Sequence, residues 1–132
     1  MARPRTAHPT PAELEALKVL WDRGPSTVRE VMDALESSRR SRAYTSVMSL
    51  LNVMAEKRLV ARKPQGRAFL YAAAVPREKT LNRLVSDLWR RAFEQSASTM
   101  VAHLLEETSP SEEELRAIRE AIEAYRKERE DE

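Results

Sequence analysis

The stretch from residue 43 to residue 71, AYTSVMSLLNVMAEKRLVARKPQGRAFLY, contains the pattern that decides the fold. Its first part has apolar residues at helical spacing and predicts a helix from about Ala43 to Arg58. Its second part has two short strand-like runs, 59–63 and 68–71, on either side of Pro64–Arg67, whose glycine suits a tight hairpin turn. The stretch therefore predicts a helix followed by a β-hairpin.

Two shorter helices are predicted before this stretch, and each has its own start signal. Thr10-Pro11-Ala12-Glu13 and Thr27-Val28-Arg29-Glu30 both place a threonine three residues before a glutamate, which is the pattern of a capping box. Gly24-Pro25 is expected to end the first helix. Three helices and a hairpin, in this order, predict a winged helix, in which the third helix enters the major groove of DNA and the hairpin touches the flanking backbone.

The residues after Val75-Pro76 predict three more amphipathic helices. One copy of so short a segment can hardly bury their apolar faces, because a core of this size is marginal, and pairing with a second copy solves the problem. We therefore predict a fold that is α+β but mostly α. It has a disordered basic arm (1–9), a winged helix-turn-helix domain (10–74) and a C-terminal helical dimerisation module (75–132). The residues expected at the dimer interface are Leu81, Leu84, Leu88, Trp89, Phe93, Val101, Leu104, Leu105, Leu115, Ile118 and Ile122.

The composition argues against several other classes of protein. The chain has 132 residues, of which 33% are charged and none is cysteine, so a large catalytic cleft, disulfides and thiolate metal sites are not expected. Its two histidines lie in different predicted modules. We predict no catalytic residue, no metal site and no cofactor. No apolar run approaches the roughly 18 residues of a membrane span, and we expect a cytoplasmic protein without a membrane partner.

Charge is distributed unevenly along the chain. Residues 1–71 carry 13 Lys and Arg against 7 Asp and Glu, a net charge of +6, whereas residues 72–132 carry 10 against 14, a net charge of −4. A basic half suits the phosphates of double-stranded DNA. The residues expected at the DNA are Arg39, Arg40 and Arg42 in a loop, Ala43, Tyr44, Thr45, Ser46, Ser49 and Asn52 on the third helix, and Arg62, Lys63 and Arg67 on the wing.

Simpler interpretations of these residues remain open from the sequence. The hydroxyl-bearing residues could form an ordinary solvated helix face, and the ring of Tyr44 could pack in the core or direct its hydroxyl to a phosphate. The winged helix could also be a protein-interaction adaptor whose basic face binds an acidic partner. Binding to duplex of any sequence would separate the two functions, because an adaptor need not bind duplex at all.

Several segments together resemble the penicillinase-repressor family of the BlaI/MecI type. They are residues 10–31 (TPAELEALKVLWDRGPSTVREV), 43–48 (AYTSVM), 66–71 (GRAFLY), 96–98 (SAS), 104–107 (LLEE) and 109–115 (SPSEEEL). The resemblance covers nearly the whole chain from Thr10. It implies a homodimer that binds a palindromic operator and represses genes for β-lactam resistance or another stress response.

The resemblance also implies a way of releasing the DNA. In relatives, a membrane sensor-protease acts as antirepressor and triggers cleavage of an Asn-Phe bond in the second module. This chain has His103-Leu104 at the matching positions. The sequence therefore leaves open whether release occurs by proteolysis, by ligand binding or by a change in dimerisation.

Overall fold

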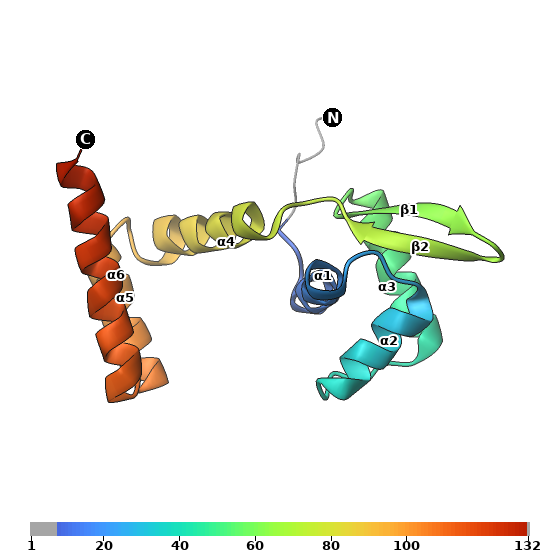
Figure 1. Cartoon of the computed structure of the whole chain (residues 1–132), viewed down its shortest axis with the longest axis horizontal. Coiled ribbons are helices and arrows are strands. Elements are labelled where there is room, and N and C mark those ends of the chain that lie inside the picture. Colours follow the sequence, from blue (N-terminus) through green and yellow to red (C-terminus); the bar gives the residue numbers. More distant parts are fainter. Residues whose placement is uncertain (1–7, 132) are drawn as a thin grey trace. The chain divides into compact units, whose positions relative to one another are not determined.

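The computed structural model describes residues 8–131, so most of the predicted basic arm, residues 1–7, lies outside the described residues. Six helices and a two-stranded antiparallel sheet make up the described chain (Figure 1). They are α1 (Pro11–Arg23), α2 (Val28–Ser37), α3 (Tyr44–Glu56), β1 (Val60–Gln65), β2 (Ala68–Ala73), α4 (Arg77–Ala92), α5 (Ala97–Thr108) and α6 (Glu112–Glu130). The mostly helical α+β class and the predicted element order are confirmed.

The predicted start signals of α1 and α2 and the predicted stop of α1 are confirmed. Thr10 caps α1 by accepting a hydrogen bond from the Glu13 backbone N–H at 3.2 Å, while the Glu13 carboxylate accepts one from the Thr10 N–H at 2.9 Å. Thr27 and Glu30 form the same capping box at the start of α2. Gly24 ends α1 with φ of 85°, a backbone conformation that glycine adopts without a steric penalty.

The hairpin is longer than the sequence predicted. Pro64 and Gln65 belong to β1, not to the turn, and the strands pair from Val60 opposite Ala73 to Gln65 opposite Ala68. A two-residue turn remains, with φ of 63° at Gly66. Because Gln65 and Ala68 form the hydrogen-bonded pair next to this turn, Pro64 falls in a non-hydrogen-bonded pair, where its missing N–H costs no bond of the ladder.

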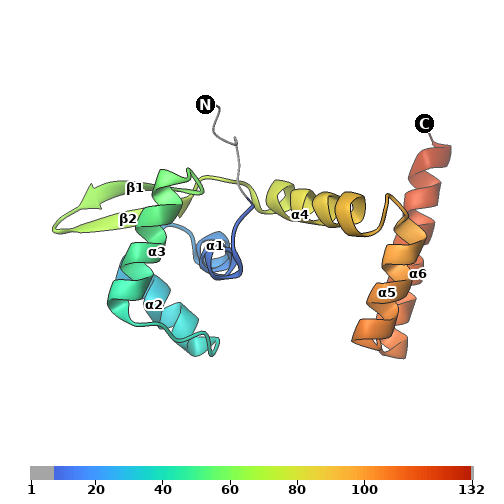
Figure 2. The ribbon, with the colours of Figure 1, turned by 180° about the vertical axis from the view of Figure 1, so that it is seen from behind.

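A third extended segment joins this sheet and was not predicted. Ser26, between α1 and α2, exchanges two backbone hydrogen bonds of 2.8 Å with Tyr71 of β2. The core lies where the three helices meet this end of the hairpin (Figure 2). Its buried apolar residues are Ala16, Leu17, Leu20, Val28, Val31, Leu35, Val47, Leu51, Met54, Leu59, Val60 and Tyr71.

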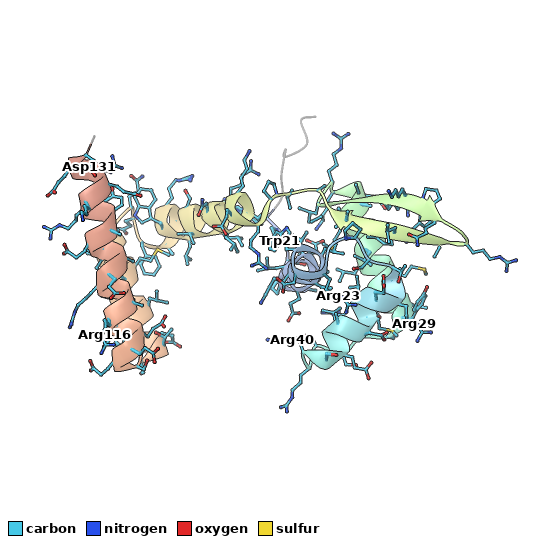
Figure 3. The ribbon with its side chains drawn as sticks, viewed as in Figure 1. Trp21, Arg23, Arg29, Arg40, Arg116 and Asp131 are labelled. Atoms are coloured by element: carbon cyan, nitrogen blue, oxygen red, sulfur yellow. The ribbon has the colours of Figure 1, made fainter. Side chains whose placement is uncertain are left out.

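The chain divides into two compact units between Ser86 and Asp87. The beginning of α4 belongs to the first unit, because the Trp21 indole N–H donates to the Val75 carbonyl at 2.9 Å and Arg77 pairs with Asp22 at 2.5 Å. Trp21 is labelled in Figure 3. The functional boundary at residues 74/75 stays a prediction.

The second unit contains no buried residue among those that the structure describes. Apolar side chains of α5 and α6 are half-buried at best, and Leu104 and Ile122 are 55% and 52% exposed. Figure 3 shows the side chains of α6, with Arg116 near its beginning and Asp131 just beyond its end. These two helices therefore have amphipathic sequences without a core to bury their apolar faces.

Candidate DNA-binding interface

The third helix, α3, buries one face and exposes the other. Val47, Leu51 and Met54 are completely buried. The opposite face exposes the hydroxyl groups of Thr45, Ser46 and Ser49, as the sequence predicted for its outer side. A helix anchored in this way presents small hydrogen-bonding side chains on a rigid support.

The N-terminus of α3 differs from those of α1 and α2. Ala43 is its N-cap and provides no side-chain hydrogen bond, and the first turn contains no acidic residue. The first backbone N–H groups of a helix have no partner within the helix, and an anion near them is stabilised by the helix dipole. The N-terminus of α3 can therefore bind a phosphate. At the N-termini of α1 and α2, the capping boxes already use the free backbone N–H groups.

The arginines in the loop before α3, residues 39–42, are all exposed, but one of them is paired with an acidic residue. Arg39, with φ of 63°, and Arg42 are exposed. Arg40, labelled in Figure 3, is also exposed, but its Nε lies 2.6 Å from a carboxylate oxygen of Glu15 on α1. Part of the predicted positive charge of this loop is thus compensated within the domain.

The wing exposes the three basic residues that the sequence placed there, Arg62, Lys63 and Arg67. Arg67 lies at the tip of the hairpin turn, directly after Gly66. Arg62 is held more firmly, because its guanidinium lies 4.6 Å from the centre of the Phe69 ring and donates to Asn52 at 2.6 Å. The wing therefore has one arginine, Arg62, held by contacts within the domain, and an exposed arginine, Arg67, at its tip.

Asn52 differs most from its predicted role. Its amide oxygen accepts hydrogen bonds from Arg62 at 2.6 Å and from the Tyr71 hydroxyl at 2.7 Å. An amide oxygen has two lone pairs, so the oxygen is fully used and only the amide nitrogen of Asn52 can donate to DNA. Asn52 connects α3 to both strands of the wing, a function that no local pattern reveals because Tyr71 is 19 residues away.

Tyr44 does not enter the core, since its side chain is 44% exposed. The guanidinium of Arg29 on α2 lies 6.0 Å from the centre of its ring. Arg29, labelled in Figure 3, is exposed and was not among the predicted DNA-binding residues. The contact places one more positive charge beside the beginning of α3.

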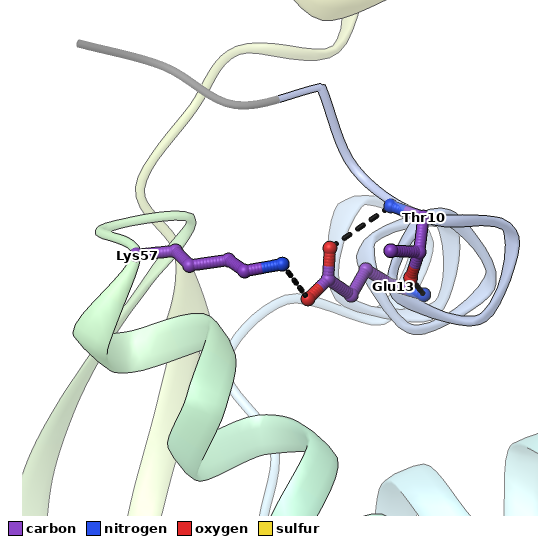
Figure 4. A network of polar contacts seen from close by, with 3 residues as sticks. All are labelled: Thr10, Glu13 and Lys57. Carbon is purple, nitrogen blue, oxygen red and sulfur yellow. Dashed lines mark hydrogen bonds and ion pairs between the residues drawn. The ribbon is translucent and has the colours of Figure 1, made fainter. Parts of the chain in front are cut away.

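A partly buried ion pair holds α3 against α1 (Figure 4). Glu13 is 2% exposed, and its second carboxylate oxygen lies 2.8 Å from the Lys57 ammonium at the end of α3. The same carboxylate accepts the hydrogen bond of the Thr10 N–H, so both of its oxygens are used. The pair ties the orientation of α3 to the first turn of α1.

Other kinds of site find no support in the part of the chain that the structure describes. Residues 8–131 contain no group of three or more His, Asp or Glu placed to hold a metal ion. None of the helices in that range is long and apolar enough to cross a membrane. Every buried polar side-chain atom there has a hydrogen-bond partner.

Three helices, a two-stranded wing and an exposed hydroxyl face flanked by arginines define a winged-helix protein of the DNA-binding class. The chain belongs to the penicillinase repressor family, whose model matches residues 9–124. Over 106 residues it is 39% identical to the transcriptional regulator BlaI of Mycobacterium tuberculosis. The alignment covers 78% of this chain and 74% of that protein. The predicted family is confirmed, and it is a family of transcriptional repressors, not of enzymes.

One solved structure has a similar fold, and a second aligns with part of the chain. The crystal structure of the transcriptional regulator Tm0710 from Thermotoga maritima aligns with 92% of this chain and 76% of its own, with a TM-score of 0.50 and 15% identity. The solution structure of monomeric Bacillus licheniformis BlaI in complex with the blaP half-operator aligns with 55% of this chain and 90% of its own, with a TM-score of 0.45 and 25% identity.

Proposed function

We propose that two copies of this chain bind a palindromic operator and repress the adjacent genes. In this proposal α3 contacts base edges in the major groove, while the wing and the loop from Arg39 to Arg42 contact phosphates. The two-fold axis of the dimer places the half-sites about one helical turn, roughly 34–36 Å, or a multiple of that apart.

The observation that carries the proposal is the beginning of α3. Its N-terminus has no side-chain cap and no acidic residue, while the hydroxyls of Thr45, Ser46 and Ser49 are exposed beside it. Such residues are weak helix formers and add little to the stability of an exposed helix. Phosphate contact by the backbone and base contact by the hydroxyl groups account for both features together.

Exposed apolar residues support the dimer. Leu81 and Leu88 on α4, Val101 and Leu104 on α5, and Ile122 on α6 are between 37% and 55% exposed in one copy. The other predicted interface residues, Leu84, Trp89, Phe93, Leu105, Leu115 and Ile118, are only half-buried. A second copy of the same helices is the partner that the proposal assigns to these faces.

The regulated genes and the working compartment belong to the proposal as well. Membership in a family of penicillinase repressors supports control of genes for β-lactam resistance or another stress response. Binding to an operator requires the compartment that holds the chromosome, which for a bacterial repressor is the cytoplasm. A sensor-protease partner stays a prediction from the resemblance. His103-Leu104 stands where relatives have the Asn-Phe pair that is cleaved.

The test is a selection of bound duplexes from a random pool, at near-physiological salt, with the full-length protein. We expect a palindromic motif. Arg67→Ala should weaken binding to all duplexes about equally, whereas Thr45→Ala should change which sequence is preferred. Arg116→Ala is the matched control, because it removes an exposed arginine of α6, outside the winged helix, and should change neither property.

Recovery of no motif, with weak salt-sensitive binding to any duplex or none, would contradict the repressor proposal. It would favour the adaptor function, in which the basic face binds an acidic protein.

A further inference from the structure

A shallow hollow runs along the exposed side of α3 and is not explained by phosphate binding. It is lined by Arg42, Thr45, Ser46, Ser49, Leu50 and Val53. Three of these residues carry hydroxyl groups, two are apolar and one is a cation. This mixture differs from the wing and from the arginine loop, which offer mainly positive charge.

The apolar part of the hollow is open to solvent. Val53 is 45% exposed, and Leu50, which packs against the core on one side, is only partly buried. Val53 follows Ser49 by one helical turn, so its methyl groups lie beside the hydroxyl groups of the outer face. Valine is a weak helix former, so helix stability does not account for an exposed valine at this position.

The major groove offers one apolar group to such a surface, the C5-methyl of thymine. Thymine also presents its O4 acceptor on the same edge, next to the methyl group. The lining of the hollow matches both features, because Leu50 and Val53 provide apolar surface and the serine hydroxyls can donate to O4. Cytosine has no methyl group, so it leaves the apolar part of the hollow unfilled, and a serine hydroxyl would have to accept from its amino group instead of donating.

We propose that this hollow recognises one thymine in each half-site of the operator. The thymine methyl packs against Val53 and Leu50, and O4 accepts a hydrogen bond from Ser46 or Ser49. Arg42, at the N-terminal end of the hollow, contacts the adjacent phosphate. The inference rests on the proposed function, since it assigns a base to the helix that the proposal places in the major groove.

The test uses the operator obtained from the duplex selection and replaces each deoxythymidine in turn by deoxyuridine. This substitution removes the methyl group and keeps O4. Burial of one methyl group contributes about 0.8 kcal/mol, which corresponds to roughly fourfold in affinity. We expect a loss of about this size at one thymine position of each half-site, measured by fluorescence anisotropy with the full-length dimer.

Two variants assign the effect to the hollow. Val53→Ala should bind the thymine operator more weakly and should lose the difference between thymine and uracil at the sensitive position. Met48→Ala is the matched control, because Met48 is an apolar residue of the same helix, 38% exposed, that does not line the hollow. It should keep the thymine-to-uracil ratio of the unaltered protein.

The inference and the proposed function can fail separately. Sequence-specific binding with equal affinity for the thymine and uracil operators at every position would overturn the inference and leave the repressor function standing. A ratio that survives in Val53→Ala, or is lost in Met48→Ala, would also overturn it. Absence of specific duplex binding would contradict the proposed function instead.

Discussion

The two compact units of this chain have helices with similar apolar patterns but bury them to different extents. In the first unit, α1, α2 and α3 bury Leu17, Val31 and Leu51 completely. In the second, α5 and α6 have apolar stripes with the same helical spacing, yet the described part of that unit has no buried residue. The difference shows that an apolar stripe predicts a face to be buried. It does not show whether the same chain or a second molecule packs against that face.

Geometry explains the contrast. The winged helix closes around its core from several directions, because three helices and the hairpin all contribute buried residues. The hairpin contributes Val60 and Tyr71, and Ser26 links it by backbone hydrogen bonds to the connection between α1 and α2. The second unit has helices alone, and a segment this short buries only a small share of its surface by itself. Four changes test this contrast, in order of decreasing effect.

The largest effect is expected from Leu51→Ala in the winged-helix core. Leu51 is 0% exposed, and truncation of such a leucine costs about 2–5 kcal/mol through lost burial and the cavity that remains. The measurement is urea unfolding followed by circular dichroism. The loss should be the same at every protein concentration, and a loss that disappears on dilution would place Leu51 at an interface between copies.

Lys57→Met is expected to have the second largest effect, because it leaves the carboxylate of Glu13 buried without its cation. We expect a loss of about 1–3 kcal/mol in the free energy of unfolding. Glu13→Gln is the matched control: it removes the charge and keeps an oxygen that can accept the hydrogen bond from the Thr10 N–H. If Glu13→Gln cost as much as Lys57→Met, packing and not the uncompensated charge would be the cause.

Leu104→Ala tests the other side of the comparison. Leu104 is 55% exposed in one copy, so the change should hardly alter unfolding of the isolated protomer. It should weaken self-association in sedimentation equilibrium by about tenfold or more, because a two-fold interface loses the side chain twice. Glu106→Ala, on the opposite side of α5, should leave association unchanged. Equal association of the Leu104→Ala variant and the unaltered protein would remove α5 from the interface.

The smallest effect concerns the link between the core and the wing. Arg58 has φ of 66° and follows α3, where its N–H donates to Ala55 and the Leu59 N–H donates to Met54. This is the Schellman arrangement, in which glycine is favoured. Arg58→Gly should therefore raise the free energy of unfolding by about 0.5–1 kcal/mol. Arg58→Ala removes the same charge but keeps a Cβ, and it should give no such gain in a thermal melt.

Much of the fold and part of the candidate site could be predicted from local patterns. The capping boxes at Thr10 and Thr27, the stop at Gly24 and the exposed hydroxyls of α3 depend on residues a few positions apart. Chain connectivity already holds such residues together, so their types and spacing are sufficient to predict their contacts.

The rest depends on residues that only folding brings together. Arg40 was predicted to be at the DNA from its charge, but its pairing with Glu15 depends on how the loop returns to α1. Arg29 was missed because its position beside Tyr44 requires α2 and α3 to be packed first. Side-chain partners across elements have no signal in a single sequence, because no spacing rule relates their positions.

By itself, the sequence determined the order of the helices and strands, the capped starts of α1 and α2 and which helix faces are apolar, because hydrogen bonding of neighbouring backbone groups and the period of the helix are local properties. It also determined the family. Only the tertiary structure decided that Asn52 connects α3 to the wing and that Lys57 pairs with a buried Glu13 44 residues away. These contacts depend on which surfaces meet in the folded chain, and their formation must offset the entropy lost when long loops close.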